Sequence, residues 1–354
     1  MGTGFYAQNL FPLVARSDAE AAHHAVLAVL HAFAPLARTL TPLVPRPVLP
    51  VRAFGLEFPF PIGLAAGLDK HAQALETWPL LGFGFAEIGT VTPRPQPGNA
   101  RPRLFRAPEL GAIVNRMGFN SDGATAVAGR LPPRATSPIP IGVNVGKNKD
   151  TPNEAAAQDY VAAIEALRHG ADYLVVNVSS PNTPDLRALQ SPDFLHGVVQ
   201  ASVQAAAGVP LLVKVAPDFG PGELEEAVIA AVEAGAAGIV ASNTTLSRPD
   251  HPHPVLRESG GLSGAPLHAL AVKTVRRVYA AVGDRVPIVG VGGVRSAEDA
   301  LRLVRAGATL VQVYSALVFE GPGLVRSMAH DLQGAQWTRE IGANASSGNS
   351  RASV

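Results

Sequence analysis

Short apolar runs alternate with helix-like segments along most of the chain after residue 60. The runs are rich in Val, Ile and Leu and are continuously apolar, which is typical of parallel strands buried on both faces. They predict eight strands, at residues 62–66, 85–91, 141–145, 173–178, 211–216, 238–242, 288–292 and 310–314. Helical patterns such as 154–169 and 222–235 lie between them.

This alternation favours one (β/α)8 barrel over a doubly wound sheet. The eight units occupy about 270 residues, close to the size of that fold. No G-x-G-x-x-G turn follows a strand, as many doubly wound sheets would have. We therefore predict an α/β protein with a single TIM barrel over residues 51–338. The Ser- and Gly-rich residues 339–354 predict a disordered tail.

Residues 1–50 predict a small helical extension ahead of the barrel. The tetrapeptide 17–20 is a capping-box pattern that opens a helix running to about Ala34, with apolar residues at helical spacing. Pro35 predicts the start of a second, shorter helix, which later prolines end in an extended linker. The pattern alone favours two helices packed flat on the barrel over a pair lying in a membrane interface.

Composition excludes several classes of function. The chain has 29 Lys+Arg against 28 Asp+Glu, a formal net charge of +1, so it has no overall basic field for nucleic acid. It has no cysteine, which excludes disulfides, thiolate metal sites and a cysteine base; we predict no metal site. It also lacks a secretory signal and a charge-free apolar stretch of about 18 residues.

Polar residues gather where the predicted strands end, the edge at which barrel enzymes place their active sites. Asn144, Asn177 and Asn243 stand at three such ends, and side-chain amides suit a planar ligand with amide or imide groups. Lys214 lies inside a strand. Because an unpaired buried ammonium is costly, we expect it to face a bound anion in preference to a barrel carboxylate.

The last two strands end in a pattern typical of a barrel phosphate site. Residues 290–294 form a Gly-rich turn, and residues 313–316 lead from a strand into a helix, so backbone N–H groups can face an anion. Alone, this pattern indicates only a phosphate-bearing ligand. Residues 261–264 add a third Gly-containing turn.

Five motifs together carry a resemblance to a known family. They are Gly67–Lys70, Asn115–Asn120, Asn177–Thr183, Ser242–Thr245 and Gly261–Gly264, in this order. They resemble dihydroorotate dehydrogenase, and the likeness runs from about residue 5 to residue 330. The resemblance implies an FMN-containing barrel that oxidises dihydroorotate to orotate in pyrimidine biosynthesis.

The residue at position 180 helps to sort the two classes of this family. The cytosolic class has a cysteine there as catalytic base, whereas this chain has Ser180, as in the membrane-associated, quinone-dependent class. The N-terminal extension also resembles that class, which reverses the preference for helices packed flat on the barrel. Ser242 where threonine is common, and Met117 where an aromatic residue often occurs, are small departures.

The resemblance implies roles for individual residues, with Ser180 as the catalytic base. Those expected to bind FMN are Ala66, Gly67, Leu68, Asp69, Lys70, Thr90, Asn144, Asn177, Lys214, Ser242, Gly264, Gly293, Tyr314 and Ser315. Those expected to bind substrate are Lys70, Asn115, Arg116, Met117, Gly118, Phe119, Asn177, Asn182, Asn243 and Thr244. A quinone tunnel would be lined by His23, Arg106 and Tyr314.

The implied partners are dihydroorotate and orotate, a membrane quinone, and a bilayer surface that the N-terminal helices contact. We expect a monomer, peripheral on the cytoplasmic face of the cell membrane. Serine is a weak base. No His or carboxylate lies near Ser180 in sequence, which predicts a water relay as its proton acceptor.

Other enzyme classes remain as alternatives. One is an FMN barrel of another specificity, such as a dihydropyrimidine or hydroxyacid oxidoreductase, although the catalytic His and Arg of hydroxyacid oxidases are not found. Another is a phosphate-binding lyase or aldolase with Lys214 as Schiff-base amine. A membrane-attached binding module would leave Lys70, Ser180 and Lys214 without a role.

Overall fold

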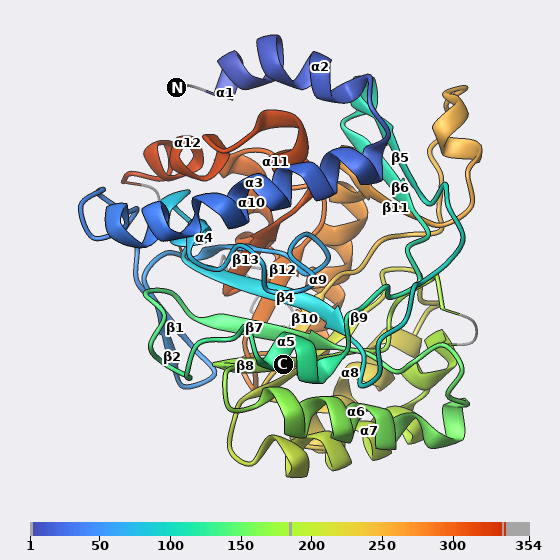
Figure 1. The fold of residues 1–354 in the computed structure, drawn as a ribbon. Helices are drawn as coiled ribbons and strands as arrows, with labels where there is room; N and C mark the ends of the chain where they lie inside the picture. The colour runs from blue at the N-terminus through green and yellow to red at the C-terminus, as the bar shows by residue number, and fades with distance from the viewer. Residues whose placement is uncertain (1–2, 184–185, 335, 338–354) are drawn as a thin grey trace, which may run out of the picture.

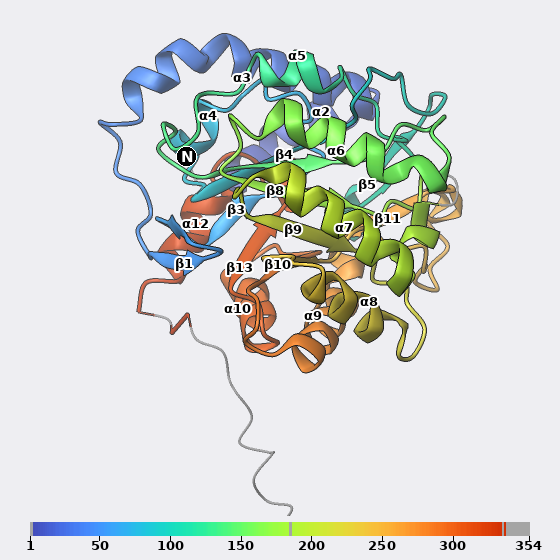
Figure 2. The same ribbon diagram turned by 90° about the horizontal axis from the view of Figure 1, so that it is seen from below.

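The computed structural model describes residues 3–183, 186–334 and 336–337, and its centre is a closed barrel of eight parallel strands (Figures 1 and 2). Around the barrel the strands follow the order β10-β12-β13-β3-β4-β7-β8-β9. Their bounds are β3 Ile62–Leu64, β4 Phe85–Val91, β7 Ile141–Val145, β8 Tyr173–Asn177, β9 Leu211–Val215, β10 Gly238–Ala241, β12 Ile288–Val291 and β13 Leu310–Val313. The eight predicted strands and the TIM barrel are confirmed. The tail predicted at 339–354 lies outside the described residues.

Helices follow the strands and pack around the outside of the ring, as Figure 2 shows for α6 to α10. The helices of the barrel are α4 Thr77–Leu80, α5 Ala124–Ala128, α6 Ala156–Leu167, α7 Pro192–Ala206, α8 Glu223–Glu233, α9 His268–Val282, α10 Ala297–Arg305, α11 Ser315–Glu320 and α12 Leu324–Asp331. The predicted helices at 154–169 and 222–235 correspond to α6 and α8. The apolar residues between strands and helices form the largest core of the described chain.

Alternate strand residues point into the barrel, and these inward positions change from apolar to polar along each strand. Phe85, Leu212 and Leu310 belong to a buried apolar cluster inside the ring. Two residues further along their strands come Glu87, Lys214 and Gln312, which share the inward direction because side chains in a strand alternate with period two. The barrel therefore has an apolar layer below a polar layer, and the polar layer faces the carboxyl ends of the strands.

A two-stranded hairpin, absent from the sequence prediction, packs against this apolar layer. It consists of β1 Val51–Ala53 and β2 Leu56–Phe58, paired antiparallel. Phe58 is fully buried, and its ring meets the ring of Phe85 edge-on at 5.2 Å between centroids. The hairpin therefore closes the amino end of the barrel, while the carboxyl end is left for a site.

The two long connections after β4 and β10 build a second sheet. It contains β5 Leu104–Ala107, β6 Ala112–Asn115 and β11 Gly261–Gly264, in the antiparallel order β11-β6-β5. Figure 1 shows this sheet at the side of the barrel where α2 and α3 meet. No strand is predicted from the sequence in either connection. Their strands are short and interrupted by Pro and Arg, so they carry little apolar periodicity.

The N-terminal extension is helical, but its boundaries differ from the prediction. Short helical segments at α1 Thr3–Phe5, Tyr6–Leu10 and α2 Phe11–Ala15 precede one long helix, α3 Ala19–Leu40. The N-cap of α3 is Asp18, whose carboxylate accepts a hydrogen bond from the Ala21 N–H at 2.8 Å. The predicted Ser17–Glu20 capping box is therefore wrong, because Glu20 turns toward the barrel.

The predicted break at Pro35 is also wrong, because α3 continues through it to Leu40. Pro35 is exposed, so its ring meets no packed element, although its missing N–H removes one bond of the helix. Leu27 and Ala37 are buried on either side of it. Packing against the barrel thus holds one helix across a residue that usually ends one.

A buried ion pair fixes α3 to the loop that leads into β5. The Glu20 carboxylate is almost fully buried and accepts hydrogen bonds from Arg103 at 2.7–3.2 Å and from Arg101 at 3.0 Å. The third guanidinium nitrogen of Arg103, Nη1, donates to the carbonyls of Pro97 and Asn99. Burial favours a higher pKa for Glu20, but the two arginines outweigh it and lower the pKa to about 2.

Replacing Glu20 with glutamine should destabilise the fold by about 3 kcal/mol at pH 7, because it leaves the buried Arg103 charge without its carboxylate partner. The contribution of the pair should be complete above pH 4.5 and should fall as the pH drops toward 2, since the folded pKa is depressed. Urea unfolding at several pH values measures both effects. The exposed Arg52–Glu57 pair offers the control, because Glu57→Gln should change stability by less than about 0.5 kcal/mol. Equal stability of the two variants would contradict the assignment.

Candidate active site

One cavity opens at the carboxyl end of the barrel and encloses about 1190 Å³ of empty space, part of it shared with solvent. Its walls come from the ends of the barrel strands, from the sheet β5–β6–β11 and from α3. The predicted residues that line it are His23, Ala66, Gly67, Lys70, Thr90, Asn115, Met117, Gly118, Phe119, Asn177, Ser180, Asn182, Lys214, Ser242, Asn243, Thr244, Gly264, Gly293, Tyr314 and Ser315. The fold thus brings together residues from position 23 to position 315.

Two glycines bring three backbone segments close together at one end of the cavity. Gly264 has φ +92°, and a Cβ there would lie 2.0 Å from the carbonyl oxygen of Gly111. Gly293 has φ +66°, and a Cβ there would lie 2.6 Å from the carbonyl oxygen of Gly264. Beside them the hydroxyls of Ser263 and Ser315 are 2.9 Å apart, and α11 begins at Ser315. Backbone amides and hydroxyls at a helix start can hold a phosphate.

Lys214 supplies a positive charge to the polar layer below the cavity. Its side chain is buried, and no hydrogen bond or ion pair joins its ammonium to another described residue. Burial lowers the pKa of Lys214, while the nearby carboxylate of Glu87 opposes that shift. The ion pair with a barrel carboxylate, the less favoured of the two sequence-based alternatives, is therefore not formed among the described residues, and the ammonium is left facing the cavity.

The Glu87 carboxylate, which does not pair with Lys214, accepts hydrogen bonds from side-chain amides. Glu87 accepts hydrogen bonds from Asn144 at 2.8 Å and from Gln312 at 2.7 Å. The side-chain oxygen of Gln312, Oε1, is buried without a partner among the described residues. Gln312 lines the cavity, so this atom and the Lys214 ammonium are an unused acceptor and an unused donor on one wall. Such a pair fits a ligand that can both donate and accept hydrogen bonds.

The asparagines at the strand ends are held in place by one another. Asn177 donates to the Asn144 side chain at 3.1 Å and to the Thr90 hydroxyl at 3.0 Å. Its own oxygen accepts from the Ser179 hydroxyl at 2.9 Å, and Asn243 donates to that hydroxyl at 2.9 Å. These bonds fix the direction of each amide before any ligand arrives.

The cavity lining also includes Lys70 and a second pair of asparagines. Asn182 donates to the Asn115 side chain at 3.2 Å, which joins the loop after β8 to the end of β6. The ammonium of Lys70 donates to the side chain of Asn120. Burial, helped by the Arg103 charge, lowers the pKa of Lys70 to about 7, although Glu20 opposes the shift. The positive charge of this ammonium would therefore stabilise a bound anionic ligand.

Ser180 stands on the loop after β8 and is buried at the cavity wall. Its hydroxyl oxygen accepts a hydrogen bond from the Asn182 N–H at 3.2 Å. No His, Asp or Glu side chain among the described residues hydrogen-bonds to it, so the sequence-based expectation of a water as proton acceptor remains a prediction.

The three residues of the predicted quinone tunnel lie in different places. His23 and Tyr314 line the cavity, and burial lowers the pKa of His23 to about 4, with the Lys70 charge adding to the effect. Arg106 instead donates to the backbone carbonyls of Val14 and Ser17. It therefore fixes the turn between α2 and α3 to β5 and is not part of the cavity lining.

Four further predicted residues lie behind the lining. Asp69 is fully buried and accepts hydrogen bonds from the N–H groups of Gln73 and Ala74 and from the Trp78 ring, so its carboxylate organises the loop after β3. Leu68 packs into the main core. Asn144 supports the lining from below. Arg116 pairs with Glu258 at 2.8 Å and lies over the Phe105 ring. None of these four is among the residues that line the cavity, and their predicted ligand contacts stay predictions.

Sequence reasoning missed several lining residues. The main ones are Ala65, Leu104, Pro181, Ser263, Leu267, Val291, Gly292, Val294, Arg295, Gln312 and Ala316. Gln312 could have been found, because it lies two positions after the inward Leu310 on the same strand. Leu104 could not, since nothing in the sequence indicates that the connection after β4 folds back over the barrel.

Comparisons with known proteins agree on one family. A family model described as dihydroorotate dehydrogenase matches residues 48–335. A protein of Anaeromyxobacter dehalogenans named dihydroorotate dehydrogenase (quinone) is 57% identical over 316 residues, which cover 87% of this chain and 86% of that protein. One of the same name from Acidithiobacillus ferrooxidans is 49% identical, covering 92% of this chain and 94% of that protein.

A solved structure gives the same answer for the fold. The crystal structure of the dihydroorotate dehydrogenase of Eimeria tenella in complex with ferulenol superposes with a TM-score of 0.81 at 36% sequence identity. The match covers 89% of this chain and 90% of that one. The chain therefore belongs to the dihydroorotate dehydrogenase family, in its quinone-dependent class.

Proposed function

We propose that this protein oxidises dihydroorotate to orotate on bound FMN and passes the electrons to a membrane quinone. The observation that carries the proposal is a single cavity that joins an unpaired buried ammonium, Lys214, to the hydroxyl of Ser180 and to a set of pre-oriented amides. A lyase or aldolase would need the amine but would have no use for this amide-lined wall.

The residues of the cavity fit FMN. The glycine-lined end, with Gly264, Gly293 and Ser315, would hold its phosphate on backbone amides and hydroxyls. Lys214 and Gln312 would meet the polar edge of the flavin ring, where the ammonium favours negative charge. When bound, FMN supplies the two-electron acceptor that the residues of this chain lack.

The substrate would lie on the opposite wall, near Lys70. The ammonium would pair with its carboxylate, and the side chains of Asn115, Asn182 and Asn243 would meet its ring amide and imide groups. Asn177 borders both regions. Because these amides are already fixed by mutual hydrogen bonds, the substrate can be oriented with little further ordering.

Ser180 would take the proton from C5 of dihydroorotate while the C6 hydride leaves the substrate. Its hydroxyl must pass its own proton on, and a water in the cavity is the acceptor we propose. The hydrogen bond from the Asn182 N–H favours the negative charge that develops on the oxygen as this happens.

Orotate binding should weaken as the pH rises from 6 to 9. The pKa of Lys70 is about 7, so its ammonium loses its charge within this range, and orotate should bind with uptake of a proton. The dissociation constant should rise by up to about tenfold per pH unit above 7. Titration followed by the flavin spectrum measures it. Lys70→Met should remove the pH dependence, whereas Lys273→Met, on the outer helix α9, should keep it. Unchanged pH dependence in Lys70→Met would contradict the role of Lys70.

The N-terminal extension would deliver the quinone. Of the eleven exposed large apolar residues in the described part of the chain, nine lie before residue 50: Phe5, Leu10, Leu13, Val26, Val29, Phe33, Leu36, Leu43 and Val48. None of the described helices has the length and apolar character to cross a bilayer. Such a surface supports docking into the interface of a membrane, with the protein held peripherally on its cytoplasmic face. His23 of α3 lines the cavity, so a quinone that enters from the lipid side would pass it.

The visible spectrum of the purified protein tests the function as a whole. Flavin absorption should bleach when dihydroorotate is added without oxygen, and it should return with a soluble quinone but not with fumarate or NAD. Flavin absorption that does not bleach would reject the substrate. A protein that stays colourless after FMN is added, and that is trapped by borohydride with a carbonyl substrate, would favour a Schiff-base enzyme instead.

A further inference from the structure

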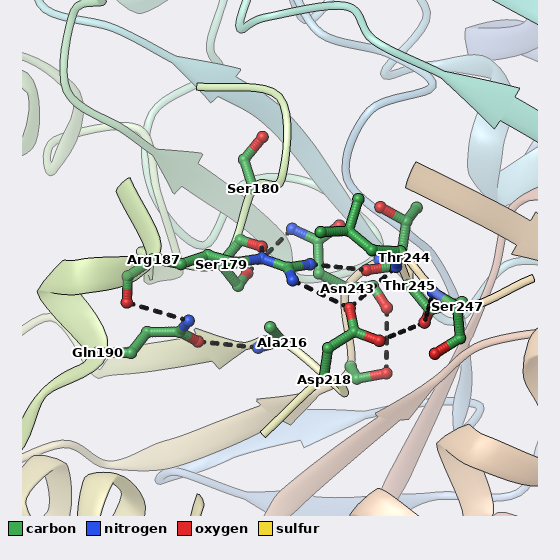
Figure 3. Close-up of polar contacts among 12 residues, drawn as sticks. Ser179, Ser180, Arg187, Gln190, Ala216, Asp218, Asn243, Thr244, Thr245 and Ser247 are labelled. Atoms are coloured by element: carbon green, nitrogen blue, oxygen red, sulfur yellow. Dashed lines mark hydrogen bonds and ion pairs between the residues drawn. The ribbon is translucent and has the colours of Figure 1, made fainter. Parts of the chain in front are cut away.

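Arg187 lies outside the cavity, yet it contacts two loops that carry active-site residues. It belongs to the short 3-10 helix Leu186–Gln190, after β8, and is not among the described residues that line the cavity. Figure 3 shows its side chain beside Ser179 and Asn243, with the Ser180 side chain pointing away from the network. Neither the family resemblance nor the cavity lining assigns it a role.

The guanidinium group of Arg187 uses each of its nitrogens on a different partner. One donates to the carbonyl oxygen of Ser179 at 3.3 Å and one to that of Thr244 at 3.3 Å. The third pairs with the carboxylate of Asp218 at 3.0 Å. These partners belong to the loops after β8, β10 and β9, so one rigid planar group joins three neighbouring loops.

Asp218 also connects Arg187 to the residues that follow Thr244. Its carboxylate accepts from the Thr245 hydroxyl and from the Leu246 N–H, the latter at 3.0 Å. Thr245 in turn exchanges two backbone hydrogen bonds with Leu262 of β11, at 2.8 and 3.1 Å. A parallel bond from the Ala216 N–H to Gln190 ties the loop after β9 to the 3-10 helix (Figure 3).

Both side chains of the Arg187–Asp218 pair are largely withdrawn from water, with 22% and 16% exposed. Desolvation offsets much of the attraction in such a pair. The pair does fix the relative positions of the loops that it joins. Ser179 precedes Ser180 and Thr244 follows Asn243, so the two carbonyls that Arg187 holds are adjacent to the proposed base and to a proposed substrate ligand.

We propose that Arg187 and Asp218 form a clamp that sets the position of Ser180 relative to Asn243 and Thr244. This inference rests on the proposed role of Ser180 in dihydroorotate oxidation. The clamp touches neither ligand, so both of its members are positioning residues. It acts on the oxidation of dihydroorotate and not on the transfer of electrons to quinone, because none of its contacts reaches α3 or His23.

Rapid-mixing measurements on the flavin-loaded protein test the clamp. Arg187→Ala should slow flavin reduction by dihydroorotate by about 10 to 100-fold, the effect of misplacing a reacting group by about 1 Å. It should also weaken orotate binding, read from the flavin spectrum without turnover. Reoxidation by a soluble quinone should stay within about twofold of wild type. Asp218→Asn should act in the same direction, and the double variant should be no slower than Arg187→Ala.

Arg277 provides the matched control. It has the same side-chain exposure of 22%, pairs with Glu225 at 2.7 Å, and also holds carbonyls of the loop after β9, at Phe219 and Gly220. It contacts neither the Ser180 loop nor the Thr244 loop, so Arg277→Ala should leave both half-reactions near wild type. Equal loss in both half-reactions of the Arg187 and Asp218 variants would show a general structural role and overturn the clamp.

Two further outcomes separate this inference from the proposed function. If Ser180→Ala slows reduction while Arg187→Ala and Asp218→Asn both reduce at the wild-type rate, the clamp alone is rejected. If Ser180→Ala itself reduces at the wild-type rate, Ser180 is not the base, and the clamp proposal falls with it. Asp218→Asn keeps the size of the side chain and an acceptor for the Leu246 N–H, so it tests the clamp even where Arg187→Ala folds poorly.

Discussion

Replacing Ser180 with alanine should slow flavin reduction by dihydroorotate by about 10² to 10⁴-fold, the usual contribution of a positioned general base. The variant removes the hydroxyl that would take the C5 proton, and among the described residues the only group hydrogen-bonded to that hydroxyl is the backbone N–H of Asn182. Flavin content and reoxidation by quinone should be unchanged, since Ser180 is not proposed to contact either the phosphate end or α3. Anaerobic rapid mixing measures the two half-reactions separately.

A second buried serine gives the control for this prediction. Ser202 on α7 is fully buried, and its hydroxyl has no partner among the described residues, so Ser202→Ala should leave both rates unchanged. Ser180→Cys should keep part of the activity and should shift the pH profile of reduction to lower pH, because a thiol has a pKa near 8.5. Wild-type reduction kinetics in Ser180→Ala would remove this residue from the mechanism.

Deleting residues 1–40 should abolish reduction of a membrane quinone while leaving flavin reduction by dihydroorotate in place. The deletion removes His23 from the cavity wall and seven of the nine exposed apolar residues of the N-terminal extension. It also leaves Arg103 without Glu20, so the truncated protein should be less stable. Vesicle cosedimentation and the two half-reactions, measured on one preparation, separate these effects. Full quinone reduction by the truncated protein would contradict the assignment.

A full-length variant keeps this prediction testable even if the truncated protein folds poorly. Val29, Phe33 and Leu36 lie on the exposed side of α3, and replacing all three with serine should weaken vesicle binding by about 100-fold, at about 1 kcal/mol for each partly buried side chain. Reduction of a short-chain soluble quinone should persist. Phe194→Ser, on the barrel helix α7 with comparable exposure, should not change vesicle binding. Equal vesicle binding by both variants would place the membrane surface elsewhere.

The sequence by itself determined the barrel and most of the cavity. Each strand is a short, continuous apolar run, and a run that is buried on both faces can be recognised without knowing its neighbours. Parallel strands all end at one edge, so a polar residue at a strand end, such as Asn177 or Lys214, is placed in the site by topology alone. The family resemblance added the roles of these residues.

Features that depend on distant partners were decided only by the tertiary structure. The sheet β5–β6–β11 forms because two connections far apart in sequence pair with each other, and neither has a clear strand pattern of its own. In the same way, α3 continues through Pro35 because the barrel buries residues on both sides of it. Local sequence signals cannot indicate the stabilisation that comes from tertiary packing, because that stabilisation arises between surfaces that meet only after folding.

The charged residues show most clearly the difference between what the sequence determines and what only the tertiary structure decides. Asp69, Arg106 and Arg116 stand within or beside motifs of the site, yet the first holds a loop, the second holds the N-terminal turn and the third pairs with Glu258. Conversely, Arg187 carries no motif of its own and connects three loops. The sequence shows where a charged residue stands and which charge it carries. Its partner depends on which segments the fold brings within hydrogen-bond distance. The sequence therefore determined which chemistry is present, and the tertiary structure decided which of these groups face the cavity and which hold it in place.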